Sequence, residues 1–479
     1  MQASILKNYL YNLSYQLLLI FAPLITLPVA SRALGPTNLG IYEYTFAVSQ
    51  YFVIFATVGL NLYSQRAIAR ARGNSSASAK IFWELVVARL ALVGLALLPF
   101  VGVTLSSPTY RLYYAILLIN IIAAGCDISW LYQGREDFRT VLIRGGLVKL
   151  LSIALIVAFV RTPDDLAIYF LFQIAPLLIG NVLLWILLRP LPKGGRVSLR
   201  SVLGHIRAQL PLAITQFLIT FYTILPRLLI KTLFPLDTEA EVAYFGVADR
   251  VVRMTMTLIT AIGLVMLSRS ATLFQLGHHE QLRDGIYRSV RFAQYGCLPL
   301  ACLLAASAPS LVPWFLGPGY APVAPTIAVL SPIIVLVGLS NAIGTQFMIA
   351  TGMERQFTVA IVLGAACGLG AALVAIPRLG SVGGAVSVLC AEIAVTAAQC
   401  VAVRKQLSLR RALRPSALYA PAAALGGVAT WGLGFLAQPS LWLTCVQAVA
   451  GGVLYLAILR AARDEMLMLS IERLRGVLR

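Results

Sequence analysis

The residues of this chain best placed to do chemistry are charged side chains inside long apolar segments. A charge near the centre of a bilayer costs roughly 2.5–3.5 kcal/mol on insertion scales, so such residues normally face a partner or a wet cavity. We expect most of them to share an aqueous space. They are Glu43, Glu84, Arg89, Asp127, Lys149, Arg227, Lys231, Asp249, Arg250, Arg253 and Glu392. Among them, Glu84 and Lys231 are expected nearer the interface, and Arg253 is expected to be rescued by Asp249 one turn away.

One face of the segment 211–234 carries a polar stripe. Its spacings of three and four residues match the repeat of an α-helix, and its members are Gln216, Thr220, Thr223, Arg227 and Lys231. Arg227 and Lys231 repel each other one turn apart, and such a pair is expected where an anion sits between them. Arg binds phosphate through forked hydrogen bonds and Lys acts as a point charge. The stripe therefore predicts a phosphate or pyrophosphate ligand.

The predicted site combines this stripe with neighbouring helices. The diphosphate ligands are expected to be Arg227, Arg250, Arg253, Lys231 and Arg32. The expected polar lining is Asn8, Asn12, Gln16, Gln216, Thr220, Thr223, Tyr42 and Tyr244. The candidates for ion coupling are Glu43, Asp249 and Asp127.

Each of these assignments has a purely structural alternative. The cations could reach the interface or be paired, and Glu43 could serve as counter-ion to Arg250 or Arg253. Arg89, Asp127 and Lys149 could form an ion-pair network holding the first half together. The aromatic residues could be interface anchors instead of platforms for sugar rings.

The amino-acid composition indicates which kind of structure positions these charged residues. The 479 residues are 59% hydrophobic and only 12% charged, against about 25% charged in soluble domains. No water-soluble fold hides this much apolar surface, so we expect an all-α integral membrane protein of about fourteen transmembrane helices. The expected spans are 9–33, 41–63, 81–104, 111–133, 141–160, 167–188, 211–234, 242–266, 292–316, 324–350, 357–376, 383–402, 416–436 and 441–459. The first exceeds the core of a signal peptide and is expected to be retained.

The net charge of +20 follows the expected topology. Alternate connections carry nearly all of the basic excess, including Arg135, Arg139 and Arg144 in one of them. Short loops rich in Lys and Arg stay in the cytoplasm, so both termini are expected there. This excess gives no reason to expect a nucleic-acid partner. All loops are short, which leaves no room for a soluble catalytic domain, and we do not expect an enzyme.

Cysteine and histidine usage argues against metal or redox chemistry. The seven cysteines lie in apolar segments without a CxxC pair, and the histidines His205, His278 and His279 are expected in polar loops. We expect no metal and no cofactor. A short surface helix is expected through 198–209.

A weak internal repeat links the two halves. Pro28 and Pro226 each follow a Leu near the outer end of a predicted helix, and Tyr42 and Tyr244 each open the next one. Two six-helix halves around a midplane site are typical of transporters. We therefore expect lobes over 1–208 and 209–403, followed by two C-terminal helices and a basic tail over 404–479.

Three blocks resemble a known family. They are KNYLYNLSYQLLLIFAPLITLPVASRALGPTNLGIYEYT (7–45), INIIAAGCDISWLYQGREDFRTVLIR (119–144) and FLGPGYAPVAPTIAVLSPIIVLVGLSNAIGTQFMIATGMERQFT (315–358). They resemble Wzx-type polysaccharide repeat-unit flippases of the multidrug/oligosaccharidyl-lipid/polysaccharide exporter superfamily. Glu43 departs from the pattern, since such sequences often have a neutral residue there.

The resemblance implies two pseudo-symmetric six-helix lobes plus two helices, a cationic cavity and alternating access. It also implies an undecaprenyl-pyrophosphate-linked oligosaccharide as substrate, in capsule, O-antigen or exopolysaccharide synthesis, at the bacterial inner membrane. The expected partners are this polyprenyl-diphosphate oligosaccharide, membrane lipids, and a glycan polymerase with its chain-length machinery. The alternatives are a peptidoglycan lipid precursor flippase, a multidrug antiporter of the same superfamily, and an integral-membrane glycan polymerase or ligase.

Overall fold

The computed structural model describes the backbone of residues 2–57, 59–71, 73–188 and 197–468. Side chains are described over the same ranges except at 2–20, 62, 211–213, 215, 257–265, 268 and 269. Every regular element in these ranges is helical. Eight of the described helices are long and apolar enough to cross a bilayer by length and composition.

The expected spans coincide with helices or with halves of bent helices. α1 (Gln2–Thr57) covers the first two expected spans, and α13 (Glu354–Val403) covers the eleventh and twelfth. Two other spans are each divided into shorter helices, at residues 127–128 and 331–332. The all-α membrane architecture of about fourteen spans is confirmed.

The chain divides into two compact units, Met1–Leu228 and Leu229–Arg479. The boundary lies inside α8 (Leu199–Leu233), where the sequence predicted a surface helix and a separate spanning helix. The structure joins the two into one continuous helix. The first turns of α8 are held within the first unit because Val202 and Gln209 are buried there. The lobe limits expected at 208 and 403 remain predictions.

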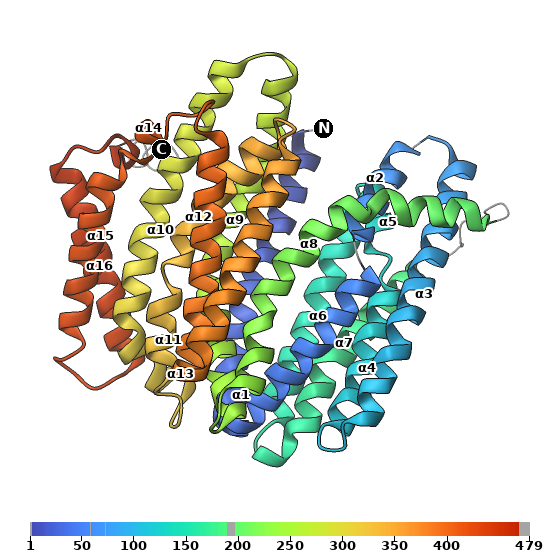
Figure 1. Cartoon of the computed structure of the whole chain (residues 1–479), viewed down its shortest axis with the longest axis horizontal. Coiled ribbons are helices and arrows are strands. Elements are labelled where there is room, and N and C mark those ends of the chain that lie inside the picture. The colour runs from blue at the N-terminus through green and yellow to red at the C-terminus, as the bar shows by residue number, and fades with distance from the viewer. Residues whose placement is uncertain (1, 58, 72, 189–196, 469–479) are drawn as a thin grey trace. The chain divides into compact units, whose positions relative to one another are not determined.

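In the first unit, α1 packs against α3, α4, α6 and α7, and α4 packs against α7 (Figure 1). The unit contains α1, α2 (Leu60–Arg70), α3 (Ser75–Ser106), α4 (Arg111–Cys126), α5 (Ser129–Gly134), α6 (Phe138–Phe159), the 3-10 helix η1 (Pro163–Asp165), α7 (Leu166–Leu187) and most of α8.

In the second unit, α10 contacts α9, α11 and α12 and also carries the pair formed by α15 and α16 (Figure 1). The unit contains the end of α8, α9 (Thr238–Gln275), α10 (His279–Leu316), α11 (Val323–Leu330), α12 (Ile333–Ser340), the π-helix η2 (Asn341–Ile349), α13, α14 (Leu409–Leu413), α15 (Ser416–Leu433) and α16 (Leu441–Ala461).

Both bent helices turn at a glycine with positive φ, which is 72° at Gly35 in α1 and 54° at Gly380 in α13. At the second bend, the backbone N–H of Ser381 donates to the Glu241 carboxylate of α9 at 2.6 Å. A Cβ atom on Gly380 would collide with that carboxylate. The bend therefore needs glycine for its backbone conformation and for the space that the capping carboxylate occupies.

We predict that Gly380→Ala lowers the stability of the protein by at least about 1 kcal/mol, because alanine is strained at this φ and displaces Glu241. The apparent Tm of purified protein in detergent measures the effect. Gly370→Ala in the same helix is the matched control, since a Cβ atom there would meet no neighbouring atom within 4 Å. That control should leave Tm unchanged or raise it. Equal behaviour of the two variants contradicts the role of the bend.

A polar network fastens the α15–α16 pair to α10. Arg291 of α10 donates to Asp464 at 2.8 Å and to Glu465 at 2.6 Å, both just after α16. Tyr419 of α15 donates its hydroxyl to the same Asp464 carboxylate at 2.9 Å. Burial alone would raise the pKa of Asp464, but hydrogen bonds from Arg291, Tyr419 and the Leu467 N–H hold that pKa below its ordinary value of 3.8.

The sign of this pKa shift predicts an acid-sensitive attachment. A lowered folded-state pKa contributes stability that is present above pH 3.8 and is lost as the pH falls through the folded value. Between about pH 6 and about pH 3, the apparent Tm of the wild type should fall more than that of Asp464→Asn. Asp284→Asn is the control, because its pair with Arg411 is largely exposed and such pairs contribute little. Parallel curves for Asp464→Asn and wild type exclude this account.

Candidate functional site

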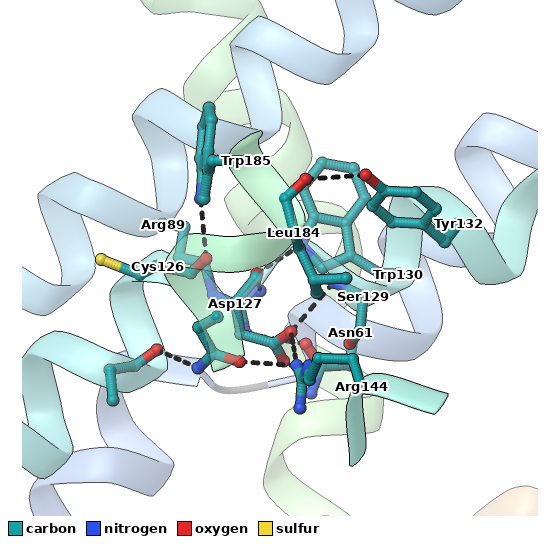
Figure 2. A network of polar contacts seen from close by, with 12 residues as sticks. Asn61, Arg89, Cys126, Asp127, Ser129, Trp130, Tyr132, Arg144, Leu184 and Trp185 are labelled. Carbon is teal, nitrogen blue, oxygen red and sulfur yellow. Dashed lines mark hydrogen bonds and ion pairs between the residues drawn. The ribbon is translucent and has the colours of Figure 1, made fainter. Parts of the chain in front are cut away.

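A break in the fourth spanning segment opens a polar site inside the first unit. α4 ends at Cys126, Asp127 is extended with φ −73° and ψ 113°, and α5 begins at Ser129. The break leaves backbone carbonyls without their helical partners. Trp185 of α7 donates to the Cys126 carbonyl at 2.8 Å, and Trp130 donates to the Asp127 carbonyl at 3.0 Å (Figure 2).

Arg89 of α3 uses the same break. Its side chain is among the largest that are fully buried, with 2% of the residue exposed. Its guanidinium donates to the Asp127 carbonyl at 2.5 Å and to the Asn61 amide oxygen at 2.7 Å. Carbonyl and amide oxygens thus replace water around a cation within a spanning helix, which membrane helices require.

Arg144 of α6 completes the network in Figure 2. It donates to the Asp127 carboxylate at 3.4 Å and to the Asn181 amide oxygen at 2.5 Å. Gly180 makes room for it, because a Cβ atom there would lie 3.0 Å from Cδ of Arg144 and closer still to Val148. The close approach of α7 to α6 at Gly180 places Arg144 beside Asn181, the next residue of α7.

These residues border a cavity of about 810 Å³. Its lining includes Arg89, Asp127 and Arg144, and the amide side chains of Gln50, Asn61, Asn120, Gln133 and Asn181. The sequence pointed to Arg89 and Asp127 but assigned Arg144 to a loop, and it missed the amides. The structure pairs Arg144 with Asp127, whereas Lys149 lies half-buried further along the same helix. Asparagine and glutamine facing inward from several apolar helices were the available signal.

The predicted stripe on α8 begins in the first unit. Gln216 is exposed, and the Thr220 and Thr223 hydroxyls donate back to the carbonyls of Gln216 and Thr220 at 2.9 and 3.1 Å. Arg227 forms an ion pair with Glu43 of α1 at 3.2 Å, with the Arg227 side chain 12% exposed and that of Glu43 3% exposed. The counter-ions considered for Glu43 were Arg250 and Arg253, so its pair with Arg227 is a finding of the structure.

The remaining cations of the stripe lie in the second unit. Lys231 forms an ion pair with Glu239 and donates to the Thr238 hydroxyl at 2.9 Å. Arg253 is paired with Asp249 at 2.7 Å, as expected from their spacing. Other predicted site residues there are half-buried: Arg250 beside this pair on α9, and Tyr244, which packs edge-on against Tyr320.

Other predicted residues have varied environments. Arg32 is exposed, and Tyr42 is 4% exposed in an aromatic cluster with Phe46, Tyr169 and Phe170. The side chains of Asn8, Asn12 and Gln16 lie outside the described residues.

His205 was expected in a loop, but it lies in helix α8, where it contacts the buried Glu84. Glu84 is 3% exposed, and His205 on α8 lies 3.2 Å from its carboxylate. The other ring nitrogen of His205 lies 2.8 Å from the Tyr63 hydroxyl. The reason is that α8 starts before the membrane span and packs this turn against α2 and α3.

The profile of the family described as "Polysaccharide biosynthesis protein" matches residues 5–267, which is more than half of the chain. The chain belongs to this family. The family resemblance that the three sequence blocks predicted is thereby confirmed. Glu43, Arg89, Asp127, Arg144 and Arg227 all lie in the matched part.

Two curated relatives align with most of this chain. A protein of Escherichia coli (strain K12) is 26% identical over 410 residues, 84% of this chain and 97% of the relative. A protein of Shigella dysenteriae is 23% identical over 377 residues, 78% of this chain and 93% of the relative. Both carry the name "Putative O-antigen transporter".

Solved structures show the same fold. The lipid II flippase MurJ in an inward closed conformation matches 96% of this chain and all of its own, with a TM-score of 0.74 and 13% identity. An inward-facing multidrug resistance MATE family transporter of the MOP superfamily matches 82% of this chain and 95% of its own, with a TM-score of 0.65 and 16% identity.

We predict that Glu43 and Arg227 are energetically coupled. Glu43→Ala and Arg227→Ala each remove one partner of a buried pair and should each destabilise the first unit by about 3 kcal/mol. The double variant should be destabilised by clearly less than the sum of the two single variants, because it leaves no unpaired charge buried. Thermal unfolding in detergent of the wild type, the two single variants and the double variant gives the coupling energy by a double-mutant cycle. Additive losses would show that this pair carries no coupling.

Proposed function

We propose that this chain is a flippase that moves a lipid-linked oligosaccharide from the cytoplasmic to the outer face of a bacterial inner membrane. Family membership carries the proposal. The curated relatives named as O-antigen transporters support the substrate class, and the membrane transporter fold supports the reaction type. The undecaprenyl-pyrophosphate carrier and the alternating-access cycle are the finer parts of the proposal.

The physical task explains why cations lie in these helices. Lipid tails exclude a sugar chain on a diphosphate, whereas the polyprenyl tail can remain in the bilayer. Side chains that replace the water around the diphosphate lower this barrier. Outward movement of negative charge also gains about 2.3 kcal/mol per charge per 100 mV of inside-negative potential.

Arg227 is the first diphosphate ligand in this proposal, and Arg250 is the second, with Arg253, Lys231 and Arg32 adding positive charge. The buried Glu43 carboxylate is the group with which the diphosphate competes for Arg227. Glu43, Asp249 and Asp127 are then the carboxylates available to take up a coupling ion.

Topology and partners follow from the same proposal. The basic connections support an orientation with both termini in the cytoplasm. The translocated oligosaccharide is passed to a glycan polymerase and its chain-length machinery on the outer face.

We predict that Arg227→Ala combined with Arg250→Ala reduces export of surface glycan at least tenfold, because forked contacts to the diphosphate are lost. Surface glycan is measured in cells that contain matched amounts of each variant in the membrane. The conservative double variant, Arg227→Lys with Arg250→Lys, should retain part of the export, since Lys keeps the charge but not the fork.

Arg378→Ala is the matched control for that experiment. Arg378 is exposed and donates to the Val374 carbonyl of its own helix. Its removal should leave export unchanged. Normal export by the Arg227→Ala, Arg250→Ala protein rejects this diphosphate site, and normal export in cells lacking the gene rejects the proposed function.

A further inference from the structure

The cavity beside Arg89 and Arg144 has the size of a ligand site. Its volume of about 810 Å³ falls within the roughly 300–1,000 Å³ of small-molecule pockets. It is built entirely by helices of the first unit, and neither Arg227 nor Arg250 lines it. The proposed diphosphate site therefore assigns no part of the substrate to this polar space.

Two buried hydrogen-bond donors at this cavity lack a protein partner. Both are guanidinium Nε atoms, one on Arg89 and one on Arg144, whose outer nitrogens hold Asp127, Asn61 and Asn181. Leaving a buried charged donor unpaired costs free energy. Each Nε atom exposes less than 1 Å², so a ligand that presents oxygen acceptors removes that cost when the two side chains turn toward it.

The charge of the lining indicates which acceptor fits. Two guanidinium groups face one carboxylate, that of Asp127, so the lining has a surplus positive charge. An anionic oxygen is favoured over a neutral one at such a site. Amide groups on Gln50, Asn120 and Gln133 and the Ser129 hydroxyl lie around the same space, and they can both donate to and accept from ligand hydroxyl groups.

We propose that this cavity binds an acidic sugar residue of the transported oligosaccharide. Its carboxylate contacts Arg89 and Arg144, and its hydroxyls contact the amide side chains. This inference rests on the proposed function and narrows its substrate to glycans that contain a uronic-acid type of sugar. It also assigns specificity to the first unit, separately from the diphosphate ligands.

Binding of simple probes to the purified full-length protein tests the chemistry. Calorimetry should show measurable binding of glucuronate and at least tenfold weaker binding of glucose. Inorganic phosphate is the third probe, and its binding shows whether the cavity accepts any small oxyanion instead of a sugar carboxylate. Arg144→Gln should weaken glucuronate binding at least tenfold, a loss of about 1.4 kcal/mol. Equal affinities for glucose and glucuronate overturn the proposal. Binding of phosphate without any binding of glucuronate also overturns it.

A steric variant keeps the test independent of the ion pairs. Leu142 lines the cavity, so Leu142→Trp should fill it and abolish glucuronate binding. Ile143, the next residue of α6, is 45% exposed and does not line the cavity, so Ile143→Trp is the matched control and should bind like wild type. Unchanged binding by a folded Leu142→Trp protein overturns the site.

A transport assay with an acidic and a neutral substrate distinguishes a failure of this inference from a failure of the proposed function on which it rests. In proteoliposomes, the wild type should flip a lipid-diphosphate oligosaccharide that contains glucuronate, and Arg144→Gln should slow this at least tenfold. The same variant should have little effect on a neutral oligosaccharide. Equal slowing of both substrates overturns the acidic-sugar site while keeping the flippase. Failure of the wild type with both substrates rejects the proposed function, and the binding data alone then decide the cavity.

Discussion

The whole structure depends on matching every charge that the apolar helices enclose. Within the first unit, Glu43 is paired with Arg227, Glu84 lies against His205, and Arg89 is surrounded by oxygen atoms. An unmatched charge at such depth is expensive, and these contacts join α8 to α1 and to α3, and α3 to the break after α4. The same requirement makes the partly satisfied guanidinium groups informative, because they mark a place where the protein alone has not completed the match.

Helix breaks and close helix contacts provide the matching groups. Asp127 leaves the helical conformation and presents its carbonyl to Arg89, while Gly180 lets α7 approach α6 closely enough for Asn181 to accept from Arg144. Irregular backbone at membrane depth is tolerated where it is buried in protein or lines a cavity, and here it does both. The geometry of the site is thus a property of the backbone as well as of the charged side chains.

The sequence predicted the spans well because hydropathy over some twenty residues depends on composition alone. It also pointed to Arg227 and to the Asp249–Arg253 pair, whose spacing is local. It did not find the Glu43–Arg227 pair or the Glu84–His205 contact, because these join residues far apart in the chain. Arg144 was assigned to a loop, since a cation at the start of a span indicates topology until its tertiary partners are known. The sequence also did not predict that α8 is continuous, because the contacts of its first turns with α2 and α3 join residues far apart in the chain.

The link between Arg89 and the break at Asp127 has an evolutionary consequence. The arginine needs the carbonyl that the break exposes, and the exposed carbonyl needs a donor. A mutation that restored a continuous helix would strand the cation, and a mutation that removed the cation would leave the carbonyl to Trp130 alone. The cation therefore depends on the break more than the break depends on the cation, and homologues that keep the arginine should also keep the break.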